Sequence, residues 1–129
     1  MIFHPTEPCI IGILDWELST LGDPLADLAY QLMAWQIPRE GGIAGLAGLD
    51  RAELGLPSDE DYIAAYCQRT GRSGIDNWPF YMAFCFFRIA AILQGIKKRA
   101  QIGTASSAEA DSRAIMVGPL AALGAACIP

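Results

Sequence analysis

A carboxylate stands directly after an apolar run near the start of the chain. Residues Cys9–Leu14 are typical of a buried strand, and Asp15 follows that strand at once, with Trp16 and Glu17 behind it. A carboxylate fixed at the end of a strand can hold a hard divalent cation with little reorganisation. The residues themselves leave a second interpretation open, in which Asp15 is a polar strand end or a cap.

Three further carboxylates follow Asp15. Asp23 precedes Pro24, which is typical of an N-cap followed by proline at the first helical position. Asp27 lies nearly opposite the apolar stripe of that helix, so periodicity alone predicts a solvated side chain. Glu17 is either an exposed strand-end carboxylate or a residue that points into a cleft.

The pattern of apolar and turn residues along the chain predicts a mainly α protein with an N-terminal β-hairpin. Met1–Phe3 and Cys9–Leu14 form the hairpin, and a helix with an apolar stripe follows Pro24. Two short strands do not make an independent sheet, so the hairpin is expected to belong to something larger. The other expected elements are a glycine-containing loop over Pro38–Pro57, a helix from Ser58 to Gly71, a long apolar helix from Asn77–Pro79 to Gln101, and a last helix with a Ser106/Glu109 capping box, broken or kinked at Gly118–Pro119.

The composition excludes some classes of function. A net charge of −5 and a pI of about 4.6 argue against nucleic-acid binding. Hydrophobic residues make up 53% of the 129 residues, which predicts either a generous core or a surface that another part covers. The apolar segment Phe80–Leu93 is expected to be too short to span a membrane, and Arg88 lies in its middle.

The cysteines and the single histidine give no catalytic pattern. Cys9, Cys67, Cys85 and Cys127 form no CxxC pair, and only His4 could join them, so a zinc site or a disulfide framework is not expected. Reduced thiols in a cytoplasmic protein are the prediction. A hydrolytic triad has no support.

The segment Ile10–Tyr30, IIGILDWELSTLGDPLADLAY, resembles the stretch after the catalytic loop of aminoglycoside-phosphotransferase-like and choline-kinase-like enzymes. The resemblance implies the C-terminal lobe of a protein-kinase-like α+β fold. It implies that Asp15 is the counterpart of the DFG aspartate and ligates Mg²⁺ on ATP, and that Asp27 supports the catalytic loop. Trp16 and Glu17 are then candidate cleft residues.

A second segment, Phe87–Ser107, resembles the late helix of phosphotransferases associated with acyl-CoA dehydrogenases. This resemblance implies a hydroxylated acyl-CoA as the small-molecule hydroxyl acceptor, beside an aminoglycoside-like one. Arg88 is otherwise expected to be a core residue with a carboxylate partner. Lys97–Arg99 are otherwise expected to form a solvated helix end, with a site for CoA phosphates as the alternative. Acceptor contacts are expected from the Pro38–Pro57 loop and the Trp78–Phe87 helix.

The family pattern places HGDxxxxN, with its catalytic aspartate, just upstream of this strand, and Met1 comes immediately after the place where the asparagine of that motif should stand. Residues 1–129 are therefore expected to be a partial C-terminal lobe without nucleotide lobe, catalytic loop or catalytic base, and to be inactive alone. Three interpretations stay open: a truncated phosphotransferase, one chain of a two-chain kinase, or a non-catalytic helical interaction module that self-associates through its apolar surface. No membrane or nucleic-acid partner is expected.

Overall fold

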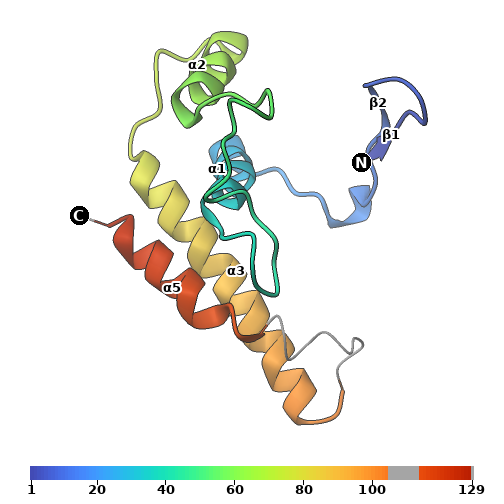
Figure 1. Cartoon of the computed structure of the whole chain (residues 1–129), viewed down its shortest axis with the longest axis vertical. Coiled ribbons are helices and arrows are strands. Elements are labelled where there is room, and N and C mark those ends of the chain that lie inside the picture. Colours follow the sequence, from blue (N-terminus) through green and yellow to red (C-terminus); the bar gives the residue numbers. More distant parts are fainter. Residues whose placement is uncertain (105–113, 129) are drawn as a thin grey trace.

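The computed structural model describes residues 1–104 and 114–128, and in these ranges the protein is mainly helical with a two-stranded hairpin at its N-terminus (Figure 1). This confirms the expected fold class. The elements are β1 (Ile2–Phe3), β2 (Ile10–Gly12), a short 3-10 helix (Trp16–Leu18), α1 (Pro24–Gln36), α2 (Asp59–Thr70), α3 (Trp78–Gln101) and α5 (Val117–Ala126).

The hairpin is antiparallel, with Ile2 opposite Gly12. The prediction of a buried strand over Cys9–Leu14 is wrong in length and in burial: β2 has three residues, and Ile10 and Ile11 are 51% and 59% exposed. Figure 1 shows the reason: the hairpin stands apart from the helices, and none of the helices in the described ranges covers either of its faces.

Helix α1 begins where the sequence predicted. The Asp23 carboxylate accepts a hydrogen bond from the Leu25 N–H at 3.0 Å, and Pro24 occupies the first helical position, where its missing N–H leaves no partner unsatisfied. The apolar stripe of α1 packs against α3, and α3 packs in turn against α5. The buried residues of these three helices form one core: Leu25, Leu28, Ala29, Leu32, Met33, Trp35, Met82, Cys85, Phe86, Ala90, Leu93 and Leu120.

Helix α3 is the longest element and runs through the centre of the helical body (Figure 1). The expectation of a membrane-short segment concerned Phe80–Leu93, whereas the whole of α3 is long and apolar enough to cross a membrane by length and composition alone. The core helix of a soluble protein passes the same test. In this protein the buried residues of α3 contact α1 and α5 as part of the core.

Helix α5 begins just after a turn at Ile115–Met116, so the break predicted near Gly118–Pro119 falls at the start of the helix. Pro119 then lies in the first turn, where proline is tolerated. The capping box predicted at Ser106 and Glu109 lies outside the described residues.

The contact between α3 and α5 is close at one glycine. A Cβ atom at buried Gly124 would lie 3.1 Å from the Cβ of Phe86, closer than most atom pairs of this kind approach. Glycine at this position therefore lets α5 lie directly on the core face of α3.

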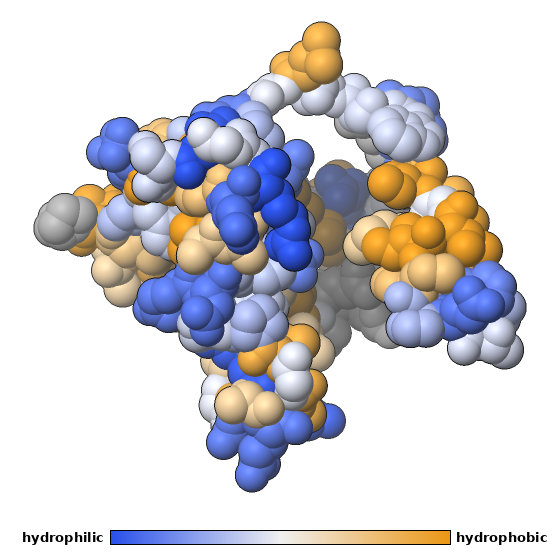
Figure 2. Space-filling view, turned by 90° about the horizontal axis from the view of Figure 1, so that it is seen from above, coloured by the Kyte–Doolittle hydropathy of each residue, from blue (hydrophilic) through white to orange (hydrophobic). Residues whose placement is uncertain are grey.

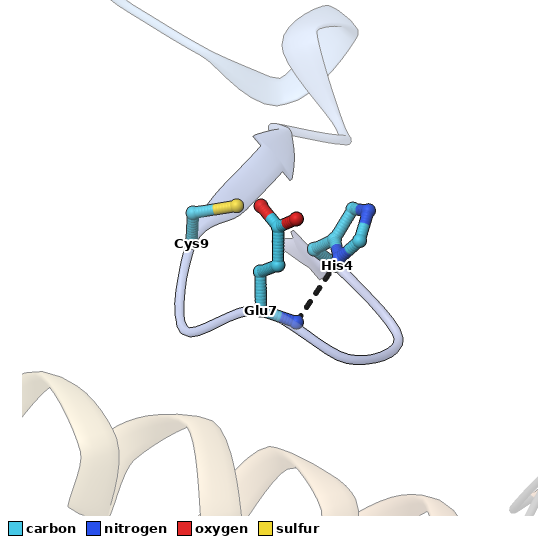
Figure 3. A group of neighbouring side chains, drawn as sticks. All are labelled: His4, Glu7 and Cys9. Atoms are coloured by element: carbon cyan, nitrogen blue, oxygen red, sulfur yellow. Dashed lines mark hydrogen bonds between the residues drawn. The ribbon is translucent and has the colours of Figure 1, made fainter.

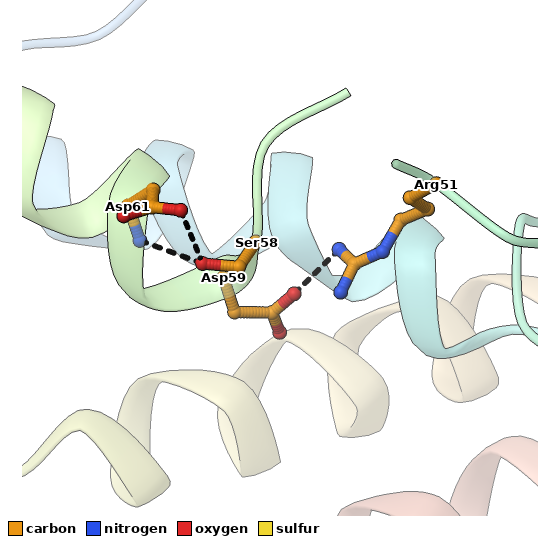
Figure 4. Close-up of polar contacts among 4 residues, drawn as sticks. All are labelled: Arg51, Ser58, Asp59 and Asp61. Atoms are coloured by element: carbon orange, nitrogen blue, oxygen red, sulfur yellow. Dashed lines mark hydrogen bonds and ion pairs between the residues drawn. The ribbon is translucent and has the colours of Figure 1, made fainter. Parts of the chain in front are cut away.

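Helix α2 is fixed at its start by Ser58, whose Oγ accepts from the Asp61 N–H at 3.0 Å and donates to the Asp61 carboxylate at 2.9 Å (Figure 4). Arg51 from the preceding loop forms an ion pair with Asp59 in the same turn. The Arg51 guanidinium also lies 4.6 Å from the centre of the Trp35 ring. The long loop predicted between α1 and α2 is thus tied to both helices.

Candidate functional site

Asp15 follows β2 after two residues and adopts a left-handed backbone conformation, with φ 63° and ψ 35°. Non-glycine residues adopt this region rarely, and such residues often mark functional sites. Asp15 stands at the N-cap position of the 3-10 helix, yet its carboxylate accepts no capping hydrogen bond there. The alternative role as a cap is therefore not realised, and the exposed carboxylate remains available to a ligand.

Trp16 and Glu17 lie in the 3-10 helix directly after Asp15. The Trp16 ring N–H donates to the Ile13 carbonyl at 2.8 Å, and the Ser19 hydroxyl donates to the Trp16 carbonyl at 2.7 Å. These bonds fix the backbone on both sides of Glu17, although Trp16 is still 66% exposed. Hydrogen bonds within the turn therefore hold the backbone next to Asp15 in place.

Asp27 lies in the first turn of α1 and is exposed, as its place opposite the apolar stripe predicts. Figure 1 shows the segment that follows the hairpin standing away from α1, so the turn that Asp15 begins and the helix that carries Asp27 lie apart. The predicted support of a catalytic loop by Asp27 stays a prediction.

A polar contact that the sequence did not reveal joins α1 to α3. The Tyr81 hydroxyl donates to the Asp23 carboxylate at 2.7 Å, across 58 residues of sequence. This bond, followed by the bond from the Leu25 N–H, lowers the pKa of Asp23 below its ordinary value of 3.8, and the same contact raises the pKa of Tyr81. The start of α1 is thereby held against α3.

Acid should weaken this link in a defined way. Because the folded pKa of Asp23 is lowered, its stabilising contribution is present above pH 4 or so and is lost as the pH falls through the folded value. We expect Tyr81→Phe to lower the melting temperature at pH 7, and the difference from the wild type to shrink near pH 3. Thermal melts of both proteins at several pH values test this. A difference that is independent of pH would show that Asp23 does not carry the effect.

Arg88 lies half-buried on α3 with its guanidinium 4.5 Å from the centre of the Tyr30 ring. The expected carboxylate partner is not found in the described parts of the chain, where Arg51 and Asp59 form the ion pair. A cation–π contact satisfies Arg88 instead. Lys97, Lys98 and Arg99 are exposed in the last turns of α3, as expected for a solvated helix end.

The hairpin turn brings together His4, Glu7 and Cys9, whose candidate ligand atoms lie within 4.8 Å of one another (Figure 3). Sequence spacing did not indicate this group. However, His4 Nδ1 accepts the Glu7 N–H at 3.0 Å, so the neutral ring carries its proton on Nε2. Neither ring nitrogen offers a free lone pair to a metal ion while this bond exists. The geometry fits a histidine that stabilises the turn.

The remaining thiols are shielded. Burial raises the pKa of Cys85 and of Cys127, which keeps both in the unreactive thiol form. Cys67 is also buried, and Cys9 is exposed on the hairpin turn. All four cysteines are free, as predicted.

Apolar side chains gather on the segment Met1–Gly22, which we call the N-terminal arm (Figure 2). Large apolar residues on this arm are more than 40% exposed: Met1, Ile2, Phe3, Ile10, Ile11, Ile13, Leu14, Trp16 and Leu21. Monomeric soluble proteins rarely expose so continuous an apolar surface, which typically marks an interaction site.

Comparison with known proteins identifies a family and a solved structure with the same fold. The model of the phosphotransferase enzyme family matches residues 1–83, which include the hairpin, Asp15 and α1. A crystal structure of a candidate aminoglycoside phosphotransferase from Ralstonia eutropha superposes with a TM-score of 0.89 and is 51% identical. The match covers 98% of this chain and 38% of that one.

Curated relatives are similar over nearly the whole chain. Acyl-CoA dehydrogenase family member 10 of Mus musculus is 48% identical over 124 residues, 95% of this chain and 12% of that protein. Acyl-CoA dehydrogenase family member 11 of Homo sapiens is 39% identical over 125 residues, 96% of this chain and 16% of that protein. The chain thus spans a small part of these longer relatives. On the family match and the fold together, the chain belongs to the phosphotransferase enzyme family.

Proposed function

We propose that this chain supplies the metal-binding part of an ATP-dependent phosphotransferase that acts on a hydroxyl group of a small molecule. The observation that carries the proposal is the conformation of Asp15: a left-handed aspartate with an exposed carboxylate that makes no capping bond. Aspartate adopts this region more readily than most residues, and Asn77 adopts it as well, so the free and exposed carboxylate supports the proposal more than the backbone conformation does. The match to the phosphotransferase enzyme family covers residues 1–83, a range that includes Asp15, and this supports the proposal.

The cofactors of the proposed reaction are Mg²⁺ and ATP. Mg²⁺ is usually held by one or two carboxylates, together with water and substrate phosphates, so the single free carboxylate of Asp15 fits this donor set. When bound, the ion would neutralise charge that develops on the transferred phosphoryl group. The part of Asp15 is to hold the ion, and the bonds of Trp16 and Ser19 fix the turn that carries Asp15.

Other residues have supporting roles in this proposal. Asp27, exposed in the first turn of α1, would accept hydrogen bonds from the catalytic loop and hold it rigid. Trp16 and Glu17 would border the cleft next to the metal ion. The base that takes the proton of the acceptor hydroxyl would come from an HGDxxxxN motif, which residues 1–129 do not contain.

Two acceptor classes belong to the proposal. The acyl-CoA dehydrogenase names of the mouse and human relatives support an acyl-CoA, which would need a hydroxyl group to accept phosphate, and the name of the Ralstonia protein supports an aminoglycoside. Both classes carry the hydroxyl group that the reaction needs. We place the reaction in the cytoplasm.

The proposal predicts that the 129-residue chain is inactive alone and active in a complete fold, because positioning supplies most of the catalysis in phosphoryl transfer. A joined enzyme, in which this chain replaces the matched 38% of the Ralstonia phosphotransferase, provides the test. With Mg²⁺, ATP and a panel of hydroxyl acceptors, we expect turnover by the joined enzyme and none by the chain alone. A folded joined enzyme that transfers phosphate to no acceptor, and does not bind ATP, would contradict the proposal.

The alternative is a non-catalytic helical interaction module, which the exposed apolar arm favours. That alternative predicts a folded chain that self-associates and whose melting temperature does not respond to Mg²⁺ and ATP. It also predicts that the melting temperature of the joined enzyme does not respond to Mg²⁺ and ATP. Measurements on the joined enzyme therefore distinguish the two accounts.

A further inference from the structure

Two adjoining hollows lie on the exposed side of α3. The first is a groove of about 530 Å³ between the start of α3 and the end of α5. The second is a hollow of about 470 Å³ further along α3, and Phe84 and Phe87 border both. Each volume lies in the range of about 300–1,000 Å³ that is usual for small-molecule sites. Together the hollows form one surface that can hold a ligand with two chemically different parts.

The groove is apolar on both sides. Phe80, Phe84 and Phe87 form one wall, and Cys127 and Ile128 at the end of α5 form the other. The rings of Phe80 and Phe84 are stacked with their centres 6.5 Å apart, so they present a continuous apolar face. None of the described residues that line the groove carries a charge. Such a groove favours an alkyl chain, because the burial of methylene groups is favourable.

Two arginines border the second hollow. Arg88 and Arg99 lie about three turns apart on α3, and they are the charged residues among the described residues that line this hollow. The Arg88 guanidinium lies 4.5 Å from the centre of the Tyr30 ring, and the described parts of the chain supply it with no carboxylate partner. The hollow therefore has positive charge that an anionic ligand would complement.

Small residues keep the space between the two guanidinium groups open. Ala91 and Gly95 line the hollow between Arg88 and Arg99. A Cβ atom at Gly95 would lie 3.6 Å from Nη1 of Arg99, so the Arg99 guanidinium extends back along the helix over this glycine. Guanidinium groups that border an open space can bind a phosphate or a carboxylate through charge-assisted hydrogen bonds.

We propose that this surface binds the part of the acceptor that does not react, with an apolar chain in the groove and an anionic group, a phosphate or a carboxylate, between Arg88 and Arg99. Figure 1 shows α3 apart from the segment that carries Asp15, so the reacting hydroxyl group would lie beyond this surface. Binding energy from such a remote part of the acceptor can still serve the reaction.

The inference rests on the proposed function and selects between its two acceptor classes. An aminoglycoside is a polycation, and on this surface it would meet two positive charges and an apolar wall. An acyl chain joined to an anionic group complements both hollows. Arg88 and Arg99 are therefore specificity-determining residues.

Binding measured without catalysis tests the proposal. The joined enzyme is titrated by calorimetry, without ATP or Mg²⁺, with a long-chain hydroxyacyl-CoA, the matching free hydroxy acid and the aminoglycoside kanamycin. We expect the double variant Arg88→Gln, Arg99→Gln to raise the Kd of the acyl-CoA by at least about tenfold, because charge-assisted bonds to its anionic group are lost. The matched control is Arg69→Gln, at an exposed position on α2, which should leave this Kd unchanged.

Two further variants examine each hollow separately. Gly95→Leu fills the hollow but keeps both arginines, and leucine favours a helix, so a weaker affinity for the acyl-CoA would not come from lost charge or lost helix. Phe80→Ser removes part of the apolar wall and should raise the Kd of the long-chain acyl-CoA by about tenfold. The same variant should change the Kd of acetyl-CoA by less than about twofold, because that chain is too short to fill the groove.

The probes also distinguish the sources of the anionic group. A loss of affinity confined to the acyl-CoA assigns the hollow to phosphate, and an equal loss for the free hydroxy acid assigns it to a carboxylate. Unchanged affinity of the arginine double variant for both probes would overturn the proposal, and so would tighter binding of kanamycin than of the acyl-CoA.

Phosphate transfer to the same acceptors is measured separately. Arginine-dependent binding without transfer would uphold the binding surface while the proposed function fails. Transfer with a KM that the arginine double variant leaves unchanged would uphold the proposed function and overturn the assignment of this surface.

Discussion

Replacing Asp15 with asparagine in the joined enzyme is expected to lower kcat by about 10²–10³-fold, the loss typical of removing one preorganised electrostatic contact from a reaction centre. Asparagine keeps the shape of the side chain and tolerates a left-handed backbone, so the 3-10 turn should survive. Only the negative charge that holds Mg²⁺ is lost. Steady-state assays with saturating ATP measure the effect.

The control for this variant is Glu60→Gln, which removes the same charge from an exposed position in the first turn of α2. It should leave kcat within about threefold of the wild type, because distant surface charges act weakly. Raising the Mg²⁺ concentration should restore part of the activity of Asp15→Asn if metal affinity is what the variant lost. Activity of Asp15→Asn equal to that of the control would remove Asp15 from the reaction.

Phe86→Ala is expected to destabilise the chain by about 3–5 kcal/mol, the range for deleting a buried aromatic ring. Phe86 is fully buried in the core and lies against Gly124 of α5. Small domains are stable by only about 5–15 kcal/mol, so this loss removes a large fraction of the free energy of unfolding. Urea unfolding followed by circular dichroism measures the change.

The neighbouring residue provides the matched control. Phe87 is the same residue type on the same helix but is 69% exposed, so Phe87→Ala should change stability by less than about 0.5 kcal/mol. In both variants the slope of the unfolding curve should stay unchanged while the midpoint moves only for Phe86→Ala. Equal losses for the two variants would mean that the packing of α3 against α5 is wrong.

Local signals made most helix boundaries predictable. Asp23 followed by Pro24 marks the start of α1, and Ser58 caps α2 through the N–H of Asp61, because a cap depends on residues within one turn. The long apolar run after Asn77 likewise predicts α3 as observed. The hairpin was also predicted, because two short apolar runs flank a turn there, while the role of Asp15 as a metal ligand stays a prediction.

Long-range contacts were not predictable from spacing. The strand after Cys9 was predicted to be buried because it is apolar, but burial depends on which other segments cover it, and no helix among the described residues does. The bond from Tyr81 to Asp23 and the stacking of Arg88 on Tyr30 depend on how α1 crosses α3. Sequence periodicity gives the face of each helix but not the register between two helices.

The left-handed backbone of Asp15 also lay beyond the sequence. Aspartate adopts this conformation more readily than most residues, which is a weak signal by itself. Its carboxylate could have capped the 3-10 helix, and only the structure shows that it does not. That result argues against a structural cap and leaves the carboxylate free for the proposed ligand role.

The most direct test of the account is to locate the metal ion itself. Crystals of the joined enzyme with Mn²⁺ and a non-hydrolysable ATP analogue would show the ion by its anomalous scattering. We predict an anomalous peak about 2.1 Å from a carboxylate oxygen of Asp15 and in contact with the phosphates. A nucleotide-bound ion whose protein ligands do not include Asp15 would contradict the central claim.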